Sequence, residues 1–391
     1  MNKTFMGTAL AAAALAAQAQ APAVPAPAAN ATSNTIYGVL DLGLTLVDDI
    51  GGEKVLQGTS VGVQGSRLGF RGNVAIDREL SALYVLEAGF NPENGTLGQG
   101  GRLFGRQVFG GLKHERYGQL TFGRQYDSLV DYVQPVTANG SVGGAYFAHP
   151  YDNDNTNNTL RFNNVLKYRS PAFGPFGLSV SRGFSNQPGG TNNNSMTSVG
   201  AGYLNGALRV GAGYLQVNNG GLAAAGANPA GTATTDQIFA SSRRQKVFGL
   251  GASYLVGKQF KVGGAVTRAD YEGVNQSTTA GVSYQLDNYE LNLSYYMSPQ
   301  LTLSAAYVHT RGDVTGRGAA FASPRWDQLS LLADYQIYKG LYLYGEFIHM
   351  KAGGSPFAVA ANGGPAAKIN LVGASSTDRQ NLARVGFRYN F

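Results

Sequence analysis

The sequence predicts an all-β protein, an antiparallel transmembrane β-barrel of about sixteen strands. First, segments of about ten residues alternate between apolar and polar side chains and end at turn signals, and this is the length of a tilted strand that crosses a bilayer. Second, only 14% of the residues are charged, while the chain has 55 Gly, 22 Tyr and 19 Phe; soluble domains carry about 25% charged residues. Third, tight turns alternate with long polar connections, as in barrels that span membranes.

The N-terminus has the features of an export signal. Residues 1–19 combine a single Lys3, a short Ala-rich apolar stretch and a small-residue cleavage site, so we expect a signal peptide. Residues 20–34, rich in Pro and Ala, predict a flexible tail, and residues 35–391 form the predicted barrel domain. No other stretch approaches 18 consecutive apolar residues, so we expect no transmembrane helix. Export without an anchor helix leaves the periplasm, the exterior or the outer membrane.

The first barrel segments set the pattern of inward and outward residues. In residues 35–47, leucines share one face and Asp41 lies on the other. In the next segment Arg67 and Arg71 lie on one face and apolar side chains on the opposite face, and Glu87 follows in the inward phase. A packed soluble core would not accommodate these charges. A water-filled lumen would, so these residues are predicted to line it.

The later segments continue this pattern. Val-Gly-Ala-Gly-Tyr-Leu occurs at 199–204 and at 210–215, and we interpret these repeats as hairpin strands rather than as a solenoid unit. The alternation changes phase at Asp287 and Asn288, which predicts a bulge or a loop boundary there. The predicted strands, in chain order, are 35–47, 65–72, 80–91, 103–112, 118–125, 160–169, 176–185, 197–205, 207–218, 246–256, 260–271, 278–286 with 289–297, 301–311, 326–338, 341–350 and 382–391.

The last segment ends on an aromatic residue that is in phase with the apolar face. Phe387 and Phe391 share that face, and Arg384 and Arg388 lie on the other. This arrangement suits a closing strand at a lipid boundary.

Composition and motifs argue against several classes of function. The absence of Cys excludes disulfides and Cys-based metal sites. The four histidines lack the H-E-x-x-H spacing, and neither a nucleophile elbow nor a phosphate-binding loop is present. We therefore expect no metal, no cofactor and no enzymatic activity. The formal net charge is +7, but Lys and Arg are dispersed along the segments, which argues against nucleic-acid binding.

Several short motifs occur along the segments. They are Ile-Tyr-Gly-Val-Leu-Asp (36–41), Gly-Ser-Arg-Leu-Gly-Phe-Arg-Gly (65–72), Leu-Phe-Gly-Arg-Gln (103–107), Leu-Thr-Phe-Gly-Arg-Gln (120–125), Asn-Asn-Val-Leu-Lys-Tyr-Arg-Ser-Pro (163–171) and Val-Gly-Phe-Arg-Tyr-Asn-Phe (385–391). Together these motifs resemble the general porins of Gram-negative outer membranes, in particular their neisserial and betaproteobacterial branch. The resemblance covers essentially all of residues 35–391 and implies an outer-membrane, sixteen-stranded, homotrimeric barrel whose third external loop folds into the pore. It further implies passive diffusion of ions and small hydrophilic solutes, and reading of the C-terminal strand at Phe391 by the barrel-assembly machinery.

The same resemblance implies a row of basic residues that faces an acidic third loop, here residues 128–159. The positions that match this row are Arg67, Arg106 and Arg161. Fixed positive charge around a narrow pore favours anions over cations, so we expect an anion preference. An alternative is that these arginines only pair with loop carboxylates and hold the loop in place. Strand parity adds Arg71, Lys167 and Glu87 to the predicted constriction, and the loop adds Asp131, Asp152 and Asp154.

Parity on the segment before Lys167 makes a more detailed prediction. Arg161 and Lys167 are expected on the inward face, and Phe162 and Leu166 on the outward face.

Other functions stay open at this point: a substrate-specific channel, an outer-membrane barrel enzyme, or an adhesin with a plugged lumen. The lipid bilayer, small hydrophilic solutes and anions are the expected partners.

Overall fold

The computed structural model of this chain describes residues 32–218, 242–274, 282–316, 323–355 and 365–391. The predicted signal peptide at 1–19, and the predicted tail up to residue 31, lie outside the described residues. None of the helices in the described part is long and apolar enough to cross a membrane.

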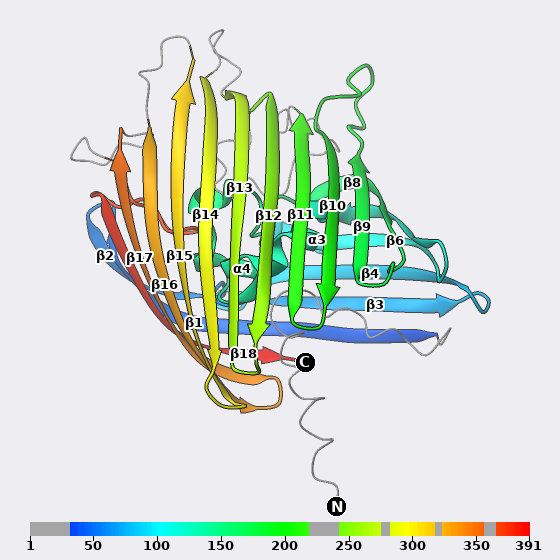
Figure 1. Cartoon of the computed structure of the whole chain (residues 1–391), viewed down its shortest axis with the longest axis horizontal. Helices are drawn as coiled ribbons and strands as arrows, with labels where there is room; N and C mark the ends of the chain where they lie inside the picture. Colours follow the sequence, from blue (N-terminus) through cyan, green and yellow to red (C-terminus); the bar gives the residue numbers. More distant parts are fainter. Residues whose placement is uncertain (1–31, 219–241, 275–281, 317–322, 356–364) are drawn as a thin grey trace, which may run out of the picture.

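The strands close into one antiparallel barrel (Figure 1). β1 (Ser33–Ile50) pairs with β18 (Arg379–Asn390) along one edge and with β2 (Glu53–Thr59) and then β3 (Arg67–Ala75) along the other, so β2 and β3 are two parts of one wall strand. β5 (Thr96–Leu97) pairs only with the end of β4 (Leu80–Asn91), inside a connection. The described residues thus confirm the predicted sixteen-stranded barrel.

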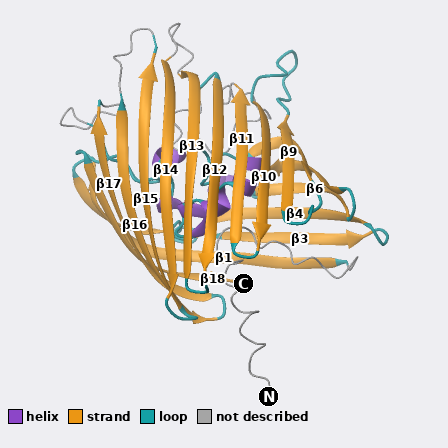
Figure 2. Ribbon diagram, in the orientation of Figure 1, coloured by secondary structure: helices purple, strands orange, loops and turns teal. Residues whose placement is uncertain are grey.

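The remaining elements follow in chain order. Apart from one helical turn, α2 (Gly98–Gly101), the helices of the described residues lie between β7 and β8, inside the ring of strands (Figure 2). The other wall strands are β6 Gln107–His114, β7 Gly118–Gln125, β8 Phe162–Arg169, β9 Phe176–Gly183, β10 Ser195–Asn205, β11 Leu208–Asn218, β12 Arg244–Val256, β13 Phe260–Val274, β14 Val282–Tyr296, β15 Leu301–Thr315, β16 Pro324–Tyr338 and β17 Leu341–Gly354.

Alternation along the wall strands separates an apolar exterior from a polar interior. In β12, Phe248 and Leu250 are each 52% exposed, whereas Val247, of the opposite parity, is fully buried toward the inside. Aromatic side chains pair across neighbouring strands near their ends: the rings of Phe260 and Tyr295 stack with centroids 4.7 Å apart. An apolar outer band bordered by aromatic residues is the surface that a barrel presents to a bilayer.

Short turns join the strands at one end of the barrel, and long connections join them at the other. Gly206, Gly257 and Gly340 begin or complete short turns with positive φ angles of 54°, 62° and 80°, a conformation that glycine adopts without steric cost. This asymmetry matches the predicted pattern of tight turns and long loops.

The predicted bulge or boundary at Asp287 and Asn288 is wrong. β14 passes through both residues in continuous register with β13 and β15, and the shift in the β13–β14 ladder lies between Tyr271 and Val274. The alternation changes because Leu286 is buried in the interior, while Asp287 on the outer face accepts a hydrogen bond of 2.6 Å from Arg268 Nε. The lipid-facing pattern ends at this height, although the strand does not.

A second difference concerns Phe162, which was expected to face outward. Asn164 has a φ of +55° and the β7–β8 register shifts between Gly123 and Gln125. This irregularity changes the phase of the strand, so Leu166 is exposed outside while Phe162 is fully buried inside.

The connection between β7 and β8, residues 126–161, is called here the inner loop because it packs against the inside of the wall. It contains α3 (Ser128–Tyr132), η1 (Gln134–Val136), α4 (Ala138–Ser141), η2 (Ala145–Phe147) and η3 (Pro150–Asp152). Asp127 caps α3 by accepting hydrogen bonds from the N–H groups of Leu129 and Val130.

Glycines of the repeated Val-Gly-Ala-Gly-Tyr motif make room for the inner loop. A Cβ atom on Gly211 would lie 1.8 Å from the carbonyl oxygen of Tyr132, and one on Gly200 would lie 2.6 Å from that of Ser128. Helix α3 therefore lies directly on the backbone of β10 and β11. The repeat in the sequence thus has a packing role in addition to its strand pattern.

Candidate functional site

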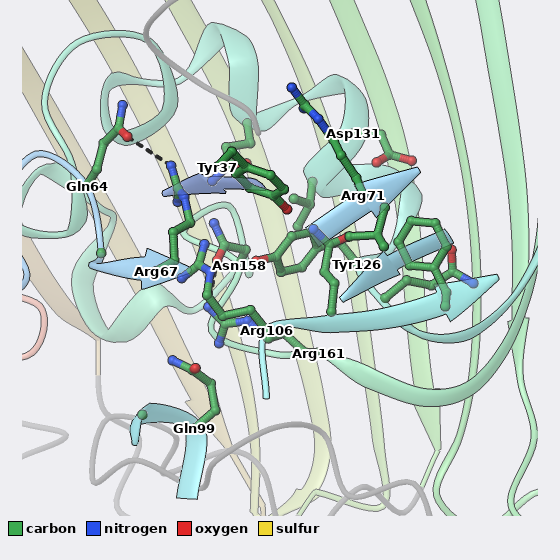
Figure 3. A pocket seen from close by; sticks show the side chains of 18 of the residues that line it. Tyr37, Gln64, Arg67, Arg71, Gln99, Arg106, Tyr126, Asp131, Asn158 and Arg161 are labelled. Atoms are coloured by element: carbon green, nitrogen blue, oxygen red, sulfur yellow. Dashed lines mark hydrogen bonds between the residues drawn. The ribbon is translucent and has the colours of Figure 1, made fainter. Parts of the chain in front are cut away.

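A cavity of about 770 Å³ lies between the inner loop and the wall formed by β1, β3, β4, β6, β7 and β8 (Figure 3). Among the described residues that line it, seven are basic and one, Asp131, is acidic. This imbalance makes the cavity strongly electropositive. The basic lining residues are Arg67, Arg71, Arg106, Lys113, Arg161, Lys167 and Arg169.

Arg67, Arg106 and Arg161 lie together at one side of this cavity, as Figure 3 shows. Arg106 Nε donates to Glu87 Oε1 at 2.7 Å. Arg67 Nη2 donates to the amide oxygen of Gln64 at 2.8 Å. Only Arg106 thus has a carboxylate partner here.

Arg161 also has a neutral environment. Its Nη2 donates to Asn158 Oδ1 at 2.9 Å, and its guanidinium group lies 5.5 Å from the centroid of the Tyr126 ring. The positive charges of Arg67 and Arg161 are therefore directed into the cavity by neutral partners. Glu87, which also accepts from Tyr37 OH at 2.9 Å, is almost fully buried behind Arg106 and does not line the cavity.

Lys167 and Asp131 form the contact between the wall and the inner loop. Lys167 Nζ lies 2.5 Å from Asp131 Oδ2, and Arg169 Nη2 lies 3.0 Å from Oδ1 of the same carboxylate. Burial alone would raise the pKa of Asp131, but Lys167 and Arg169 lower it below its usual value. The alternative of basic residues that hold the loop in place thus describes Lys167 and not the three arginines. Arg71 lies 4.8 Å from the ring centroid of Tyr37 and faces the same cavity.

Asp152 and Asp154, which were expected to face the arginines, do not line the cavity. Asp152 accepts hydrogen bonds from the N–H groups of Asn157 and Thr159 and thereby shapes a turn of the inner loop. Asp154 is fully buried and lies 2.6 Å from His149 Nδ1. The Asp152 carboxylate is thus occupied within the loop, and that of Asp154 is occupied by His149 and by Thr267 of the far wall.

His149 is an anchor that the sequence did not indicate. Its ring is fully buried, with Nδ1 on Asp154 and Nε2 3.1 Å from Glu290 Oε2 of β14. Glu290 lies 141 positions away in the chain, so no local motif connects the two residues. Burial alone would lower the pKa of His149, but Asp154 and Glu290 outweigh it and raise the pKa to about 10. The imidazole is therefore a cation held between two carboxylates.

This anchor predicts that the folded barrel is more stable in mild acid than in base. The pKa of His149 rises from 6.5 to about 10 on folding, so its contribution is complete below pH 6.5 and is lost as the pH rises through 10. Burial and the neighbouring Asp154 raise the pKa of Asp152 from 3.8 to about 7, so stability also falls as the pH rises from 3.8 to 7. The urea midpoint should therefore be lower at pH 10 than at pH 6.

The control is His149→Gln. This variant should have a lower urea midpoint at pH 6, and its urea midpoint should change less between pH 6.5 and 10. The decrease of the urea midpoint between pH 4 and 7 should persist. A variant with an unchanged slope above pH 7 would show that another group causes the dependence.

A second charged cluster, which the sequence did not indicate either, joins the first and last strands of the barrel. The Arg384 side chain on β18 is completely buried and donates to Thr45 and to Asp41 of β1, at 2.8 Å and 3.2 Å, and to Tyr344 of β17. The only signal in the sequence is the inward phase of Asp41 and Arg384. These bonds connect the first and last strands across the closing seam.

Among the described residues, no group of three or more His, Asp or Glu side chains could hold a metal ion. His309 and His349 lie just past the middle of β15 and β17, where their rings contact Asp327 and Asn381.

Comparison with known proteins adds an independent finding. The profile of the Gram-negative porin family matches residues 7–355. An outer membrane porin of Bordetella pertussis is 32% identical over 248 residues, which cover 57% of this chain and 60% of that protein. Outer membrane porin N of Escherichia coli is 25% identical over 327 residues, covering 83% and 74%. The chain thus spans about three fifths of the Bordetella relative.

Solved structures agree in fold. An anion-selective porin from Comamonas acidovorans superimposes with a TM-score of 0.70 at 20% identity, covering 92% of this chain and all of that one. OmpT of Vibrio cholerae in a trimer form gives a TM-score of 0.61 at 17% identity, covering 93% and 100%. At these identities the likeness establishes the architecture.

Proposed function

This chain belongs to the Gram-negative porin family, and we propose that it is an outer-membrane channel for the passive diffusion of ions and small hydrophilic solutes, with a preference for anions. Family membership indicates a channel rather than an enzyme, and we propose that the chain has no catalytic activity. The observation that carries the anion preference is the lining of the cavity, with seven basic residues and one acidic residue in the part that the structure describes.

The chemistry of the pore supports this preference. Arg67 and Arg161 have neutral hydrogen-bond partners, and Arg keeps its charge at any working pH. A unit charge at about 4 Å from a permeating ion contributes about 4 kcal/mol at an effective dielectric constant near 20. Water and salt reduce this figure, but two such charges still give a useful bias. The Comamonas porin described as anion-selective has the same architecture.

Reconstitution in planar bilayers tests the proposal. We expect discrete channel openings and a reversal potential in a KCl gradient that reports a higher permeability for chloride than for potassium. A barrel without conductance would contradict the channel, and a cation-selective pore would contradict the role of the arginines.

We also propose that the channel is a homotrimer, in support of which OmpT of Vibrio cholerae, with the same fold, has a trimer form. Light scattering of the detergent-extracted protein should give three times the monomer mass. A monomer that conducts normally would refute the trimer and leave the channel proposal intact.

Phe391 is proposed as a signal for the barrel-assembly machinery. Its backbone also closes the barrel, because its N–H donates to the carbonyl oxygen of Gly38 at 3.1 Å and its own carbonyl accepts from Gly38 N–H at 3.0 Å. Phe391→Ala keeps these backbone bonds and removes only the ring. We expect this variant to reduce folded protein in the outer membrane several-fold, as measured by heat-modifiable mobility in gels, while refolding into detergent in vitro proceeds. Equal losses in both settings would assign the ring to stability instead.

A further inference from the structure

One residue from outside the N-terminal half reaches the cavity. Among the described lining residues, all but one belong to positions 33–169, and the exception is Leu371. It lies in the connection between β17 and β18, whose described part, residues 365–378, is called here the outer loop. A distant segment thus contributes a single apolar side chain to a strongly basic cavity.

The outer loop is held firmly inside the barrel. Ile369 is fully buried, and its N–H donates to Gln380 Oε1 at 2.8 Å. Asn370 Nδ2 donates to the carbonyl oxygen of Ala145, in the inner loop, at 2.9 Å. The hydroxyl groups of Ser375 and Ser376 donate to Asp49 at 2.7 Å and 2.8 Å. The residues on both sides of Leu371 are therefore fixed.

The backbone of Leu371 is unusual. Its φ is +63°, a left-handed conformation that is uncommon for a residue with a large side chain and that Gly or Asn adopts more readily. The backbone conformation therefore does not explain why a leucine occupies this position. Outliers of this kind occur at functional sites, where the surrounding structure holds them in place.

The neighbours of Leu371 connect it to the segment before Arg67. Ala145, which accepts from Asn370, itself donates its N–H to the carbonyl oxygen of Gly62 at 3.2 Å. The residues on either side of Gly62, Val61 and Val63, line the same cavity as Leu371. The next residue along the chain, Gln64, accepts from Arg67. Hydrogen bonds thus link the outer loop to the inner loop, and the inner loop to the segment before Arg67.

We propose that Leu371, together with Val61 and Val63, determines specificity by forming an apolar contact beside Arg67, so that the channel favours small carboxylates that carry a short alkyl chain. The carboxylate pairs with the guanidinium group, and the alkyl chain contacts the apolar side chains. This inference rests on the proposed anion-preferring channel and names a substrate class for it. The apolar contact covers only one side of a permeating chain, so we expect the four additional CH₂ groups of hexanoate over acetate to gain together about what one fully buried CH₂ gains, roughly fourfold.

The test is the permeability ratio of hexanoate to acetate, each measured against chloride from reversal potentials. Leu371→Asn keeps a similar size and tolerates the left-handed backbone, and it should lower this ratio by part of the fourfold gain, about twofold, because Val61 and Val63 remain. Leu371→Met, which keeps an apolar side chain of similar volume, is the matched control and should retain the wild-type ratio. Val61→Thr, an isosteric change on the other part of the surface, should lower the ratio as well.

The outcomes separate this inference from the function on which it rests. A wild-type channel that does not pass anions refutes the proposed function itself. An anion-preferring channel in which Leu371→Asn and Val61→Thr both leave the hexanoate-to-acetate ratio unchanged refutes only the role of Leu371. If Leu371→Asn does not fold, as judged by heat-modifiable mobility, Val61→Thr and Leu371→Gly decide the question by the same measurement.

Discussion

Replacing Arg67 and Arg161 together with glutamine should remove most of the anion preference of the channel. Both guanidinium groups line the cavity with neutral partners, Gln64 and Asn158, so their removal leaves no orphaned carboxylate. Arg106 stays unchanged in this variant, because its loss would leave the buried carboxylate of Glu87 without its ion-pair partner. Two unit charges near the ion path, screened by about 0.1 M salt, should change the chloride-to-potassium permeability ratio by about tenfold. Reversal potentials in a KCl gradient measure this ratio.

A matched control separates the local field from net charge. Arg311 is 59% exposed and Arg325 is also exposed, both on the outer face of the barrel. Glutamine at these two positions removes the same total charge and should leave the ratio within about twofold, because the wall and the salt screen it. The effect of the pore variant should grow as salt falls from about 0.1 M to 0.01 M, where the screening length increases from about 10 Å to 30 Å. Equal effects of the two pairs would contradict the assignment.

The strands were predictable because lipid and lumen impose opposite requirements on alternate residues. That rule holds only where lipid touches the wall. It predicted the outward Leu166, but it failed at Asp287, where β14 continues beyond the apolar band and charged residues pair on the outside. It also failed at Phe162, where a local irregularity changes the phase of the strand.

The site was predictable only where it belongs to the wall. Parity and resemblance indicated Arg67, Arg106 and Arg161, and these do gather at one side of the cavity. The fold of the inner loop depends instead on contacts between residues far apart in sequence, so Asp154 could not be distinguished from a pore carboxylate. The roles of its partner His149 and of the glycines under α3 can be recognised only from the folded loop.

Glu290→Ala should release the inner loop from the wall. Glu290 Oε1 accepts hydrogen bonds of 2.7 Å from the N–H of Ala138 and from Asn292 Nδ2, and Oε2 lies 3.1 Å from His149 Nε2. Alanine leaves a buried imidazolium with one carboxylate fewer and an unsatisfied backbone N–H. Breaking a buried ion pair from one side costs about 3–5 kcal/mol. We expect a lower urea midpoint and a larger, noisier single-channel conductance, because the loop narrows the lumen.

Glu290→Gln distinguishes charge from hydrogen bonding at this anchor. Glutamine can still accept a hydrogen bond from Ala138 N–H. The Glu290→Gln variant should therefore lose less stability than Glu290→Ala, and the loss should come from the missing ion pair with His149. His149 forms the ion pair with Glu290. The loss of stability in the double variant His149→Gln with Glu290→Gln should therefore be smaller than the sum of the losses in the two single variants. Strict additivity would mean that His149 and Glu290 do not interact, and the inner loop would then be held by its apolar packing on β10 and β11 alone.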